Sequence, residues 1–184
     1  MRPPTRLVVS FALIRKLRIP LLLATIAFAG FAVSAAAAGE TPRLTPERAA
    51  AVDRAVRTFM QTVADDVTHD GPTAWLTYFD TGPAFFMAVN GQMAFPNSAA
   101  AQEGTRKFAQ AIRHIELKWS DDLRVDPLAA NLAVVAASWH ETIDNPPPGF
   151  PPEQAGYFTA LVEYRDGHWL FRDAHWSSPV PACH

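Results

Sequence analysis

The chain has 184 residues, with 16 Lys or Arg against 18 Asp or Glu, which gives a formal net charge of −2. Residues 1–38 hold five of the cationic side chains and no acidic one, so residues 39–184 carry a net charge of −7. This acidic balance, without a Lys or Arg cluster, excludes nucleic acid as a partner. The single cysteine, Cys183, excludes an internal disulfide, so the core alone must hold the domain together.

The N-terminal segment has the pattern of a secretory signal peptide. Five cationic residues lie within residues 1–18, an apolar run covers residues 19–33, and the small residues of SAAAAGE follow. This order predicts cleavage near Ala38 and export to the periplasm or the medium, with no membrane association afterwards. The alternative is an uncleaved anchor, because residues 19–38 are long enough to cross a bilayer. The chain then divides into a signal peptide (1–38), a linker (39–45), one domain (46–180) and a tail (181–184).

The domain begins with helical patterns. Thr45 is a good N-cap for a helix whose apolar residues repeat at helical spacing as far as residue 67. A second, shorter helix is predicted over residues 73–79, where the aromatic side chains of Trp75 and Tyr78 can line or plug an interior. The pair Asn90-Gly91 then indicates the turn of a hairpin.

The second half of the domain predicts a further helix and then long strands. Helices that come first and strands that come last indicate an α+β fold, with the helices packed on one face of an antiparallel sheet. The predicted elements after the second helix are a hairpin over residues 83–95, a helix over 98–114, strands over 115–125 and 132–143, and a hairpin over 156–178 that turns at Asp166-Gly167.

The register of the last hairpin makes a specific prediction. A two-residue turn at Asp166-Gly167 places Arg165 opposite His168, and counting back places Ala160 opposite Asp173 and Phe158 opposite His175. The face that carries Ala160, Asp173 and His175 is the more apolar one and holds no Lys or Arg, so we expect it to face the helices. Two interpretations follow for its polar members. Either Asp173 and His175 are a structural pair or a strand end that emerges into water, or they line a pocket beside the small side chain of Ala160.

The last hairpin carries a motif of aromatic, polar and turn residues at fixed spacing, namely Phe158, Thr159, Asp166, Gly167, Trp169, His175 and Ser177. Together with the order of the predicted elements, this motif resembles the SnoaL-like branch of the nuclear transport factor 2-like superfamily, which includes ketosteroid isomerases. The resemblance covers about residues 46–180. It implies a curved antiparallel sheet wrapped around N-terminal helices to form a cone with a ligand cavity, often in a dimer.

The same resemblance implies a candidate site. Enzymes of this family use an Asp or a His in the cone to move a proton next to a carbonyl group, and His175 as general base with Asp173 as its partner resembles such a pair. Tyr78 is the nearest counterpart of the family's oxyanion-hole tyrosine. Asp121 is a further candidate, although Asp121 and Asp122 are also a pattern for a turn or bulge. The residues expected to line the pocket are Trp75, Tyr78, Asp121, Phe158, Ala160, Phe171 and Ser177.

We expect neither a metal nor another cofactor. His140 and Glu141 point to opposite faces of their strand, and no HxH or HExxH spacing occurs. Three functions fit these observations. The first is a domain that binds a small hydrophobic molecule in the cone, and the second is an acid/base enzyme, of the isomerase, hydratase or hydrolase type, for a small carbonyl compound. The third is a homodimeric interaction module that pairs through an open sheet face with Leu161, Leu170 and Trp176.

Overall fold

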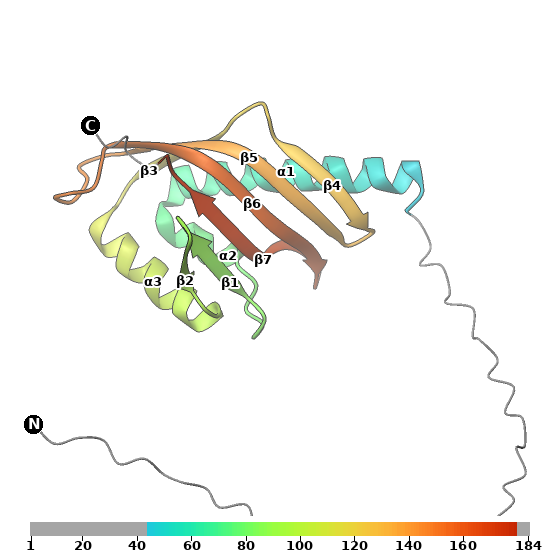
Figure 1. The fold of residues 1–184 in the computed structure, drawn as a ribbon, viewed down its shortest axis with the longest axis horizontal. Helices are drawn as coiled ribbons and strands as arrows, with labels where there is room; N and C mark the ends of the chain where they lie inside the picture. Colours follow the sequence, from blue (N-terminus) through green and yellow to red (C-terminus); the bar gives the residue numbers. More distant parts are fainter. Residues whose placement is uncertain (1–43, 180–184) are drawn as a thin grey trace, which may run out of the picture. The chain divides into compact units, whose positions relative to one another are not determined.

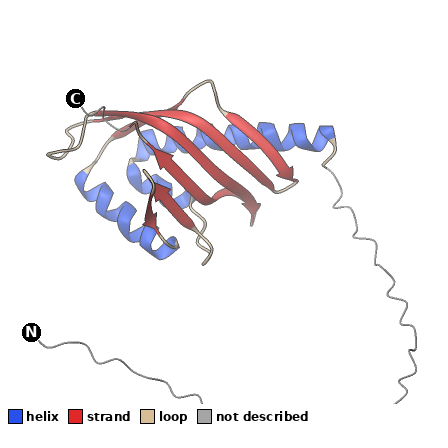
Figure 2. Cartoon of the chain, viewed as in Figure 1, coloured by secondary structure: helices blue, strands red, loops and turns tan. Residues whose placement is uncertain are grey.

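The computed structural model describes residues 44–179, so the predictions of a signal peptide, of most of the linker and of the tail lie outside the described residues. Within this part no helix is long and apolar enough to cross a membrane. Helices come first and a curved, open sheet follows, as Figures 1 and 2 show. The predicted α+β class is therefore confirmed.

The first and the last helix begin at the predicted residues, whereas the short helix predicted over residues 73–79 is a 3₁₀ turn followed by a helix that begins at Trp75. The Thr45 hydroxyl accepts a hydrogen bond from the Arg48 amide at 3.4 Å, and the Asn97 side chain accepts one from the Ala100 amide at 2.9 Å, so each caps a helix. Gly71, with a φ of 78°, ends the first helix in a conformation that glycine adopts at little cost. The helices are α1 (Pro46–Asp70), the 3₁₀ turn η1 (Pro72–Ala74), α2 (Trp75–Tyr78) and α3 (Ser98–Ala111).

The sheet has seven strands and is mixed. Its strand pairs are antiparallel except for β1 and β7, which run parallel, whereas the sequence predicted an antiparallel sheet throughout. The hairpin at Asn90-Gly91 is confirmed, and both residues have positive φ, as its tight turn requires. In sheet order the strands are β2 (Gln92–Phe95), β1 (Phe86–Val89), β7 (His168–Ser177), β6 (Glu153–Arg165), β5 (Leu132–Ile143) and β3 (Ile115–Trp119), while β4 (Arg124–Ala129) also pairs with β5.

The predicted strand over residues 115–125 is two strands in the structure. A turn at residues 120–123 separates β3 from β4, and Asp122 stabilises it by accepting hydrogen bonds from the backbone amide and the hydroxyl of Ser138, at 2.9 and 2.6 Å. Asp121 lies in this turn and is exposed, so it does not line the interior. The turn was the alternative interpretation of the two aspartates.

A β-bulge in β7 reverses the predicted faces at the end of the chain. The register is as predicted from Arg165 opposite His168 to Val162 opposite Phe171, but the next residue of β6, Leu161, lies opposite Asp173. Arg172 is thus an extra residue, and one extra residue moves every following side chain to the other face. The pairing of Ala160 with Asp173 and of Phe158 with His175 was therefore wrong.

The shifted register agrees with burial. Ala174 and Trp176 now face the helices, where Ala174 joins the core and Trp176 packs against it, while Asp173 and His175 face outward. The bulge thereby buries an indole ring and leaves a carboxylate and an imidazole near water, which is the less costly choice. The bulge lies beside the segment that follows α2. In this segment the Asp80 amide donates a hydrogen bond to the Phe171 carbonyl of β7 at 2.9 Å.

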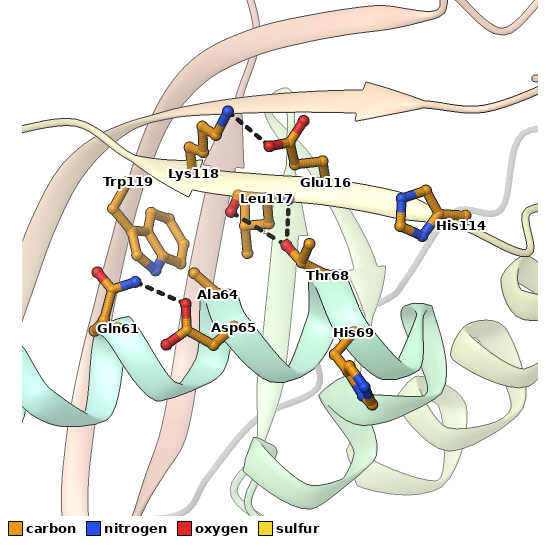
Figure 3. Close-up of a pocket in the computed structure, with 10 residues that line it drawn as sticks. All are labelled: Gln61, Ala64, Asp65, Thr68, His69, His114, Glu116, Leu117, Lys118 and Trp119. Carbon is orange, nitrogen blue, oxygen red and sulfur yellow. Dashed lines mark hydrogen bonds and ion pairs between the residues drawn. The ribbon is translucent and has the colours of Figure 1, made fainter.

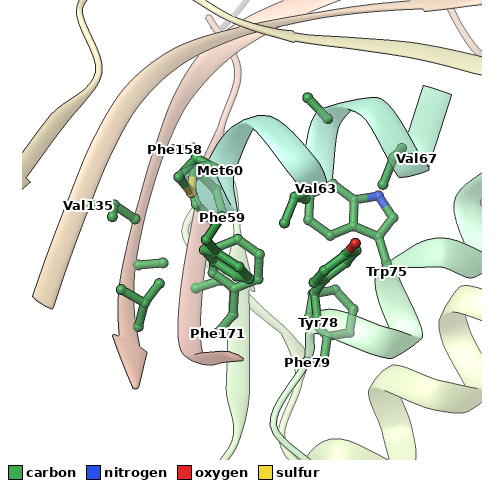
Figure 4. Close-up of a cluster of buried hydrophobic side chains, with 14 of the residues drawn as sticks. Phe59, Met60, Val63, Val67, Trp75, Tyr78, Phe79, Val135, Phe158 and Phe171 are labelled. Atoms are coloured by element: carbon green, nitrogen blue, oxygen red, sulfur yellow. The ribbon is translucent and has the colours of Figure 1, made fainter. Parts of the chain in front are cut away.

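Aromatic side chains fill the middle of the space between the helices and the sheet (Figure 4). Phe158 and Phe171 have no exposed surface, and their ring centroids are 5.4 Å apart. Phe158 also lies 4.6 Å from the ring of Trp176, and Trp75 lies 6.0 Å from Phe171. Several of the residues predicted to line a pocket are thus brought together, but there they form a packed core.

Candidate functional site

The predicted catalytic pair lies on the outer face of the sheet. Asp173 and His175 line a shallow groove of about 220 Å³, together with Phe86 and Leu161. The Asp173 carboxylate accepts a hydrogen bond from the Leu161 amide at 3.3 Å, and burial raises the pKa of this carboxyl although that hydrogen bond lowers it. Among the residues described, no hydrogen bond joins Asp173 to the exposed His175. Their catalytic role stays a prediction, but the interior position on which it depended was wrong.

Two other predicted residues have structural positions. The Ser177 hydroxyl donates to the Tyr157 carbonyl at 3.0 Å and so holds the end of β7 to β6. Ala160 is buried on the inner face opposite Ala174, where neither side chain is polar. The homodimer stays a prediction, although Trp176 belongs to the core and not to the open face proposed for it.

One groove at the edge of the interior has the character of a small-molecule site. Its volume is about 480 Å³, and its floor consists of the aromatic rings of Phe59, Tyr78 and Trp169. We call it the Tyr78 groove. Its complete lining is Ala55, Thr58, Phe59 and Thr62 on α1, Thr77 and Tyr78 on α2, and His168 and Trp169 on β7.

The aromatic floor of the Tyr78 groove is held in place by the core. The Tyr78 hydroxyl donates to the Asp66 carboxylate, and its ring lies 5.7 Å from that of Phe59 in an edge-to-face contact. Burial, followed by the bond to Asp66, raises the pKa of Tyr78 well above its usual range, so this phenol stays protonated. On the other side of the groove, Trp169 packs against Tyr164 with ring centroids 5.5 Å apart. The floor is thus preformed.

The rim of the Tyr78 groove is polar, with threonine hydroxyls and the His168 imidazole. The hydroxyls of Thr58 and Thr62 donate to the Arg54 and Thr58 carbonyls, at 3.1 and 3.0 Å, so their lone pairs remain available as acceptors. None of the lining residues is Asp, Glu, Lys or Arg. The groove therefore offers aromatic surface and neutral hydrogen-bonding groups.

A second groove lies between α1 and β3 and has a volume of about 630 Å³ (Figure 3). Several of its polar groups are paired with one another. The Thr68 hydroxyl accepts from the Leu117 amide at 3.0 Å, which satisfies this edge strand, and Lys118 pairs with Glu116 at 2.6 Å. We interpret this groove as the solvated seam where α1 covers the edge of the sheet.

Sequence reasoning missed two polar groups on the inner face of β5. Trp139 is 4% exposed, and its indole nitrogen has no hydrogen-bond partner among the described residues. Glu141 follows two residues later on the same face, and burial raises the pKa of its carboxyl to about 7. The signal was present in the sequence, because Val135, Ala137, Trp139 and Glu141 alternate on one face of a strand.

Comparison of the chain with known proteins finds likenesses in structure. No protein-family model matches it, and no curated protein matches its sequence. A protein named as a putative scytalone dehydratase, from Novosphingobium aromaticivorans, is 13% identical with a TM-score of 0.62, over 74% of this chain and 89% of that chain.

Two further structures are similar over most of their length. A hexachlorocyclohexane dehydrochlorinase (LinA, type 2) is 13% identical, with a TM-score of 0.57 over 74% of this chain and 90% of its own. A nuclear transport factor 2-like superfamily protein from Salmonella enterica is 14% identical, with a TM-score of 0.54 over 74% and 94%. At such identities the likeness concerns the fold.

Proposed function

We propose that this chain, which has the nuclear transport factor 2-like fold, binds a small, uncharged and largely apolar molecule in the Tyr78 groove. Two of the similar structures are named for enzymes of small organic compounds, scytalone and hexachlorocyclohexane, which supports a ligand of this size. The proposal includes export, because residues 1–38 have the pattern of a signal peptide.

The observation that carries the proposal is the combination of an aromatic floor with an uncharged rim. Ligand pockets are mostly apolar, with a few polar groups that orient the ligand, and usually enclose about 300–1,000 Å³, a range that includes this groove. A charged ligand would lose its hydration here, and no Asp, Glu, Lys or Arg of the lining would pair with it. The groove therefore favours a neutral ring compound that stacks on Tyr78 and Trp169.

A matched pair of fluorescent probes tests this preference. 2-Naphthol and 2-naphthoate share one ring system and differ in charge at neutral pH. We expect 2-naphthol to bind at least about tenfold more tightly, which corresponds to about 1.4 kcal/mol. Fluorescence titration measures both affinities. Equal affinities for the two probes would contradict a neutral-ligand site.

A pair of variants on α1 locates the bound probe. Ala55→Leu places a larger side chain in the groove, while Ala51→Leu makes the same change one turn earlier at an exposed position outside the lining. Both substitutions keep a strong helix former, so α1 should persist in each. We expect Ala55→Leu to weaken 2-naphthol binding about tenfold, and Ala51→Leu to leave it unchanged. Binding that is insensitive to Ala55→Leu would place the ligand elsewhere.

A further inference from the structure

We propose that a groove on the outer face of the sheet binds the ammonium group of a small organic amine. The groove has a volume of about 220 Å³ and lies on the side of the sheet that faces away from the core. We call it the Asp173 groove. The lining residues on which the proposal depends are Phe86 and Ala88 on β1, Thr159 and Leu161 on β6, and Asp173 and His175 on β7.

The carboxylate of the Asp173 groove lies between two apolar side chains. Phe86 is the partner of Asp173 on β1, and Leu161 is its partner on β6. Phe86 is 41% exposed, so its ring forms a wall that meets the solvent. Because neighbouring strands lie about 4.8 Å apart, a molecule that contacts the carboxylate can also pack against both apolar side chains.

The charge of Asp173 is not neutralised within residues 44–179. Its carboxylate accepts the Leu161 amide at 3.3 Å, but it forms no ion pair with any of the residues described. Burial raises the pKa of this carboxyl, while the bond from Leu161 and the positive charge of Arg172 lower it. A half-buried carboxylate without a paired cation is costly, and a bound cation would offset that cost.

The bulge at Arg172 places this carboxylate in the groove. Bulges often lie beside functional sites, where they re-aim a side chain. Here the bulge turns Asp173 to the outer face, and the Leu161 amide occupies only one of the two carboxylate oxygens. The structural role of Asp173 at the bulge therefore leaves its charge and its second oxygen available to a ligand.

The neighbouring row of the groove adds two further acceptors. His175 follows Asp173 on the same face, about 6–7 Å along the strand, and its partner on β6 is Thr159. An unprotonated imidazole nitrogen and a hydroxyl oxygen both accept hydrogen bonds. Ala88 is the partner of His175 on β1, and its small side chain leaves space beside this row.

These groups match a primary ammonium ion. Such an ion has three N–H donors, and the groove offers three kinds of acceptor in the Asp173 carboxylate, the His175 imidazole and the Thr159 hydroxyl. A carboxylate ligand would be repelled by Asp173, and a neutral ligand would leave the charge of Asp173 unpaired. Phe86 and Leu161 favour an apolar group next to the ammonium, and an inorganic cation would make no use of them. The ligand class is therefore a small amine with an apolar body.

Benzylamine and benzyl alcohol test whether the site requires a positive charge. The two probes share a ring and a methylene group, and at neutral pH they differ in carrying an ammonium or a hydroxyl group. Nuclear magnetic resonance follows the backbone amide of Leu161, because this amide donates to Asp173. We expect benzylamine to shift the Leu161 signal and to bind at least about tenfold more tightly than benzyl alcohol. Equal affinities, or an unmoved Leu161 signal, would overturn the proposal.

Asp173→Asn removes the charge but keeps an oxygen that can accept the Leu161 amide, so the bulge should persist. We expect this variant to bind benzylamine about tenfold more weakly and benzyl alcohol as before. Glu163→Gln is the matched control, because it removes the same charge two residues beyond Leu161 on the same face, outside the groove lining. It should bind benzylamine like the parent chain. Equal losses in the two variants would mean unspecific attraction to an acidic surface and would overturn the site.

Ala88→Leu fills the groove without a change of charge. We expect it to weaken benzylamine binding about tenfold, whereas Ala94→Leu makes the same change at an exposed position of the neighbouring strand outside the lining and should have no effect. Circular dichroism establishes that each variant is folded. Ala88→Leu decides the matter even if Asp173→Asn does not fold, and benzylamine binding that is insensitive to Ala88→Leu would overturn the proposal.

A second copy of the chain is the other occupant that this face could take. Light scattering under the conditions of the titration measures the mass, and a dimer whose Leu161 signal does not respond to benzylamine would show that the second copy covers the groove, which overturns the proposal. The Tyr78 groove lies on the opposite side of the sheet, so Asp173→Asn should leave the binding of 2-naphthol unchanged. If benzylamine fails while 2-naphthol still binds, this inference alone is wrong and the proposed function stands.

Discussion

The middle of the interior and its two ends are built differently. In the middle, Phe158 and Phe171 are completely buried and every contact between the rings is apolar. At one end the Tyr78 groove exposes an aromatic floor beneath threonine hydroxyls. At the other end the Trp139 indole nitrogen has no hydrogen-bond partner among the residues described, and burial raises the pKa of the Glu141 carboxyl. We infer a division of roles, in which the middle supplies stability and the Tyr78 groove holds the proposed ligand.

The largest change in the free energy of unfolding is expected for a substitution in the middle of the interior. Phe171→Ala removes a ring that contacts Phe59, Trp75 and Phe158, and we expect it to lower the free energy of unfolding by about 4 kcal/mol. Phe86→Ala is the matched control, because Phe86 is 41% exposed on the outer face and its loss should cost about 1 kcal/mol or less. Urea unfolding measures both. Equal losses would mean that the middle is not the stabilising region.

A smaller effect, this time a gain in stability, is expected when Glu141 is replaced. Because burial raises the pKa of Glu141 from 4.5 to about 7, the folded chain binds this proton more tightly than the unfolded chain. The free energy of unfolding should therefore fall as the pH rises from 4.5 to about 7 and then level off.

Glu141→Gln should remove this decrease in the free energy of unfolding with rising pH. Relative to the parent chain, the variant should gain on the order of 2 kcal/mol at pH 8 and little at pH 4.5, a figure already reduced because the side chain is only partly buried. Urea unfolding at both pH values measures the gain, with Glu163→Gln as control. A parent chain whose stability does not decline over this range would show that Glu141 is solvated like an ordinary surface carboxylate.

The smallest effect is expected outside the interior altogether. His175→Ala should change the free energy of unfolding by no more than about 0.5 kcal/mol, because the bulge leaves His175 exposed on the outer face. Trp176→Ala, one residue later, should cost about 2 kcal/mol because its half-buried ring packs against the core. If the two costs were reversed, β7 would have the unbulged register. Thermal or urea unfolding distinguishes these cases.

Local patterns were sufficient for most elements of the fold. Thr45 marks the start of α1, Asn90-Gly91 forms the predicted turn, and β5 spans residues 132–143 as the alternation predicts. Each of these features depends on contacts between neighbours in the chain, such as a cap, a turn or one strand's two faces. The motif in the last hairpin is also a local pattern, and it was sufficient to recognise the nuclear transport factor 2-like fold.

The candidate site was harder to predict, because its geometry depends on contacts between distant segments. The bulge at Arg172 lies where β7 meets the chain after α2, and hairpin counting from Asp166-Gly167 does not reveal it. The missing partner of the Trp139 indole, too, depends on which carbonyls the fold brings near it.

The amino-acid sequence by itself determined the helices, the turns and most strand bounds, since these follow from side-chain periodicity and local backbone preferences. Only the tertiary structure decided that Asp173 and His175 face outward, that Ala174 and Trp176 join the core, and that Glu141 lies among apolar side chains. The physical reason is that a strand has two faces. A single extra residue exchanges them, and burial by segments far away in the sequence then selects the arrangement that covers the indole and leaves the charges near water.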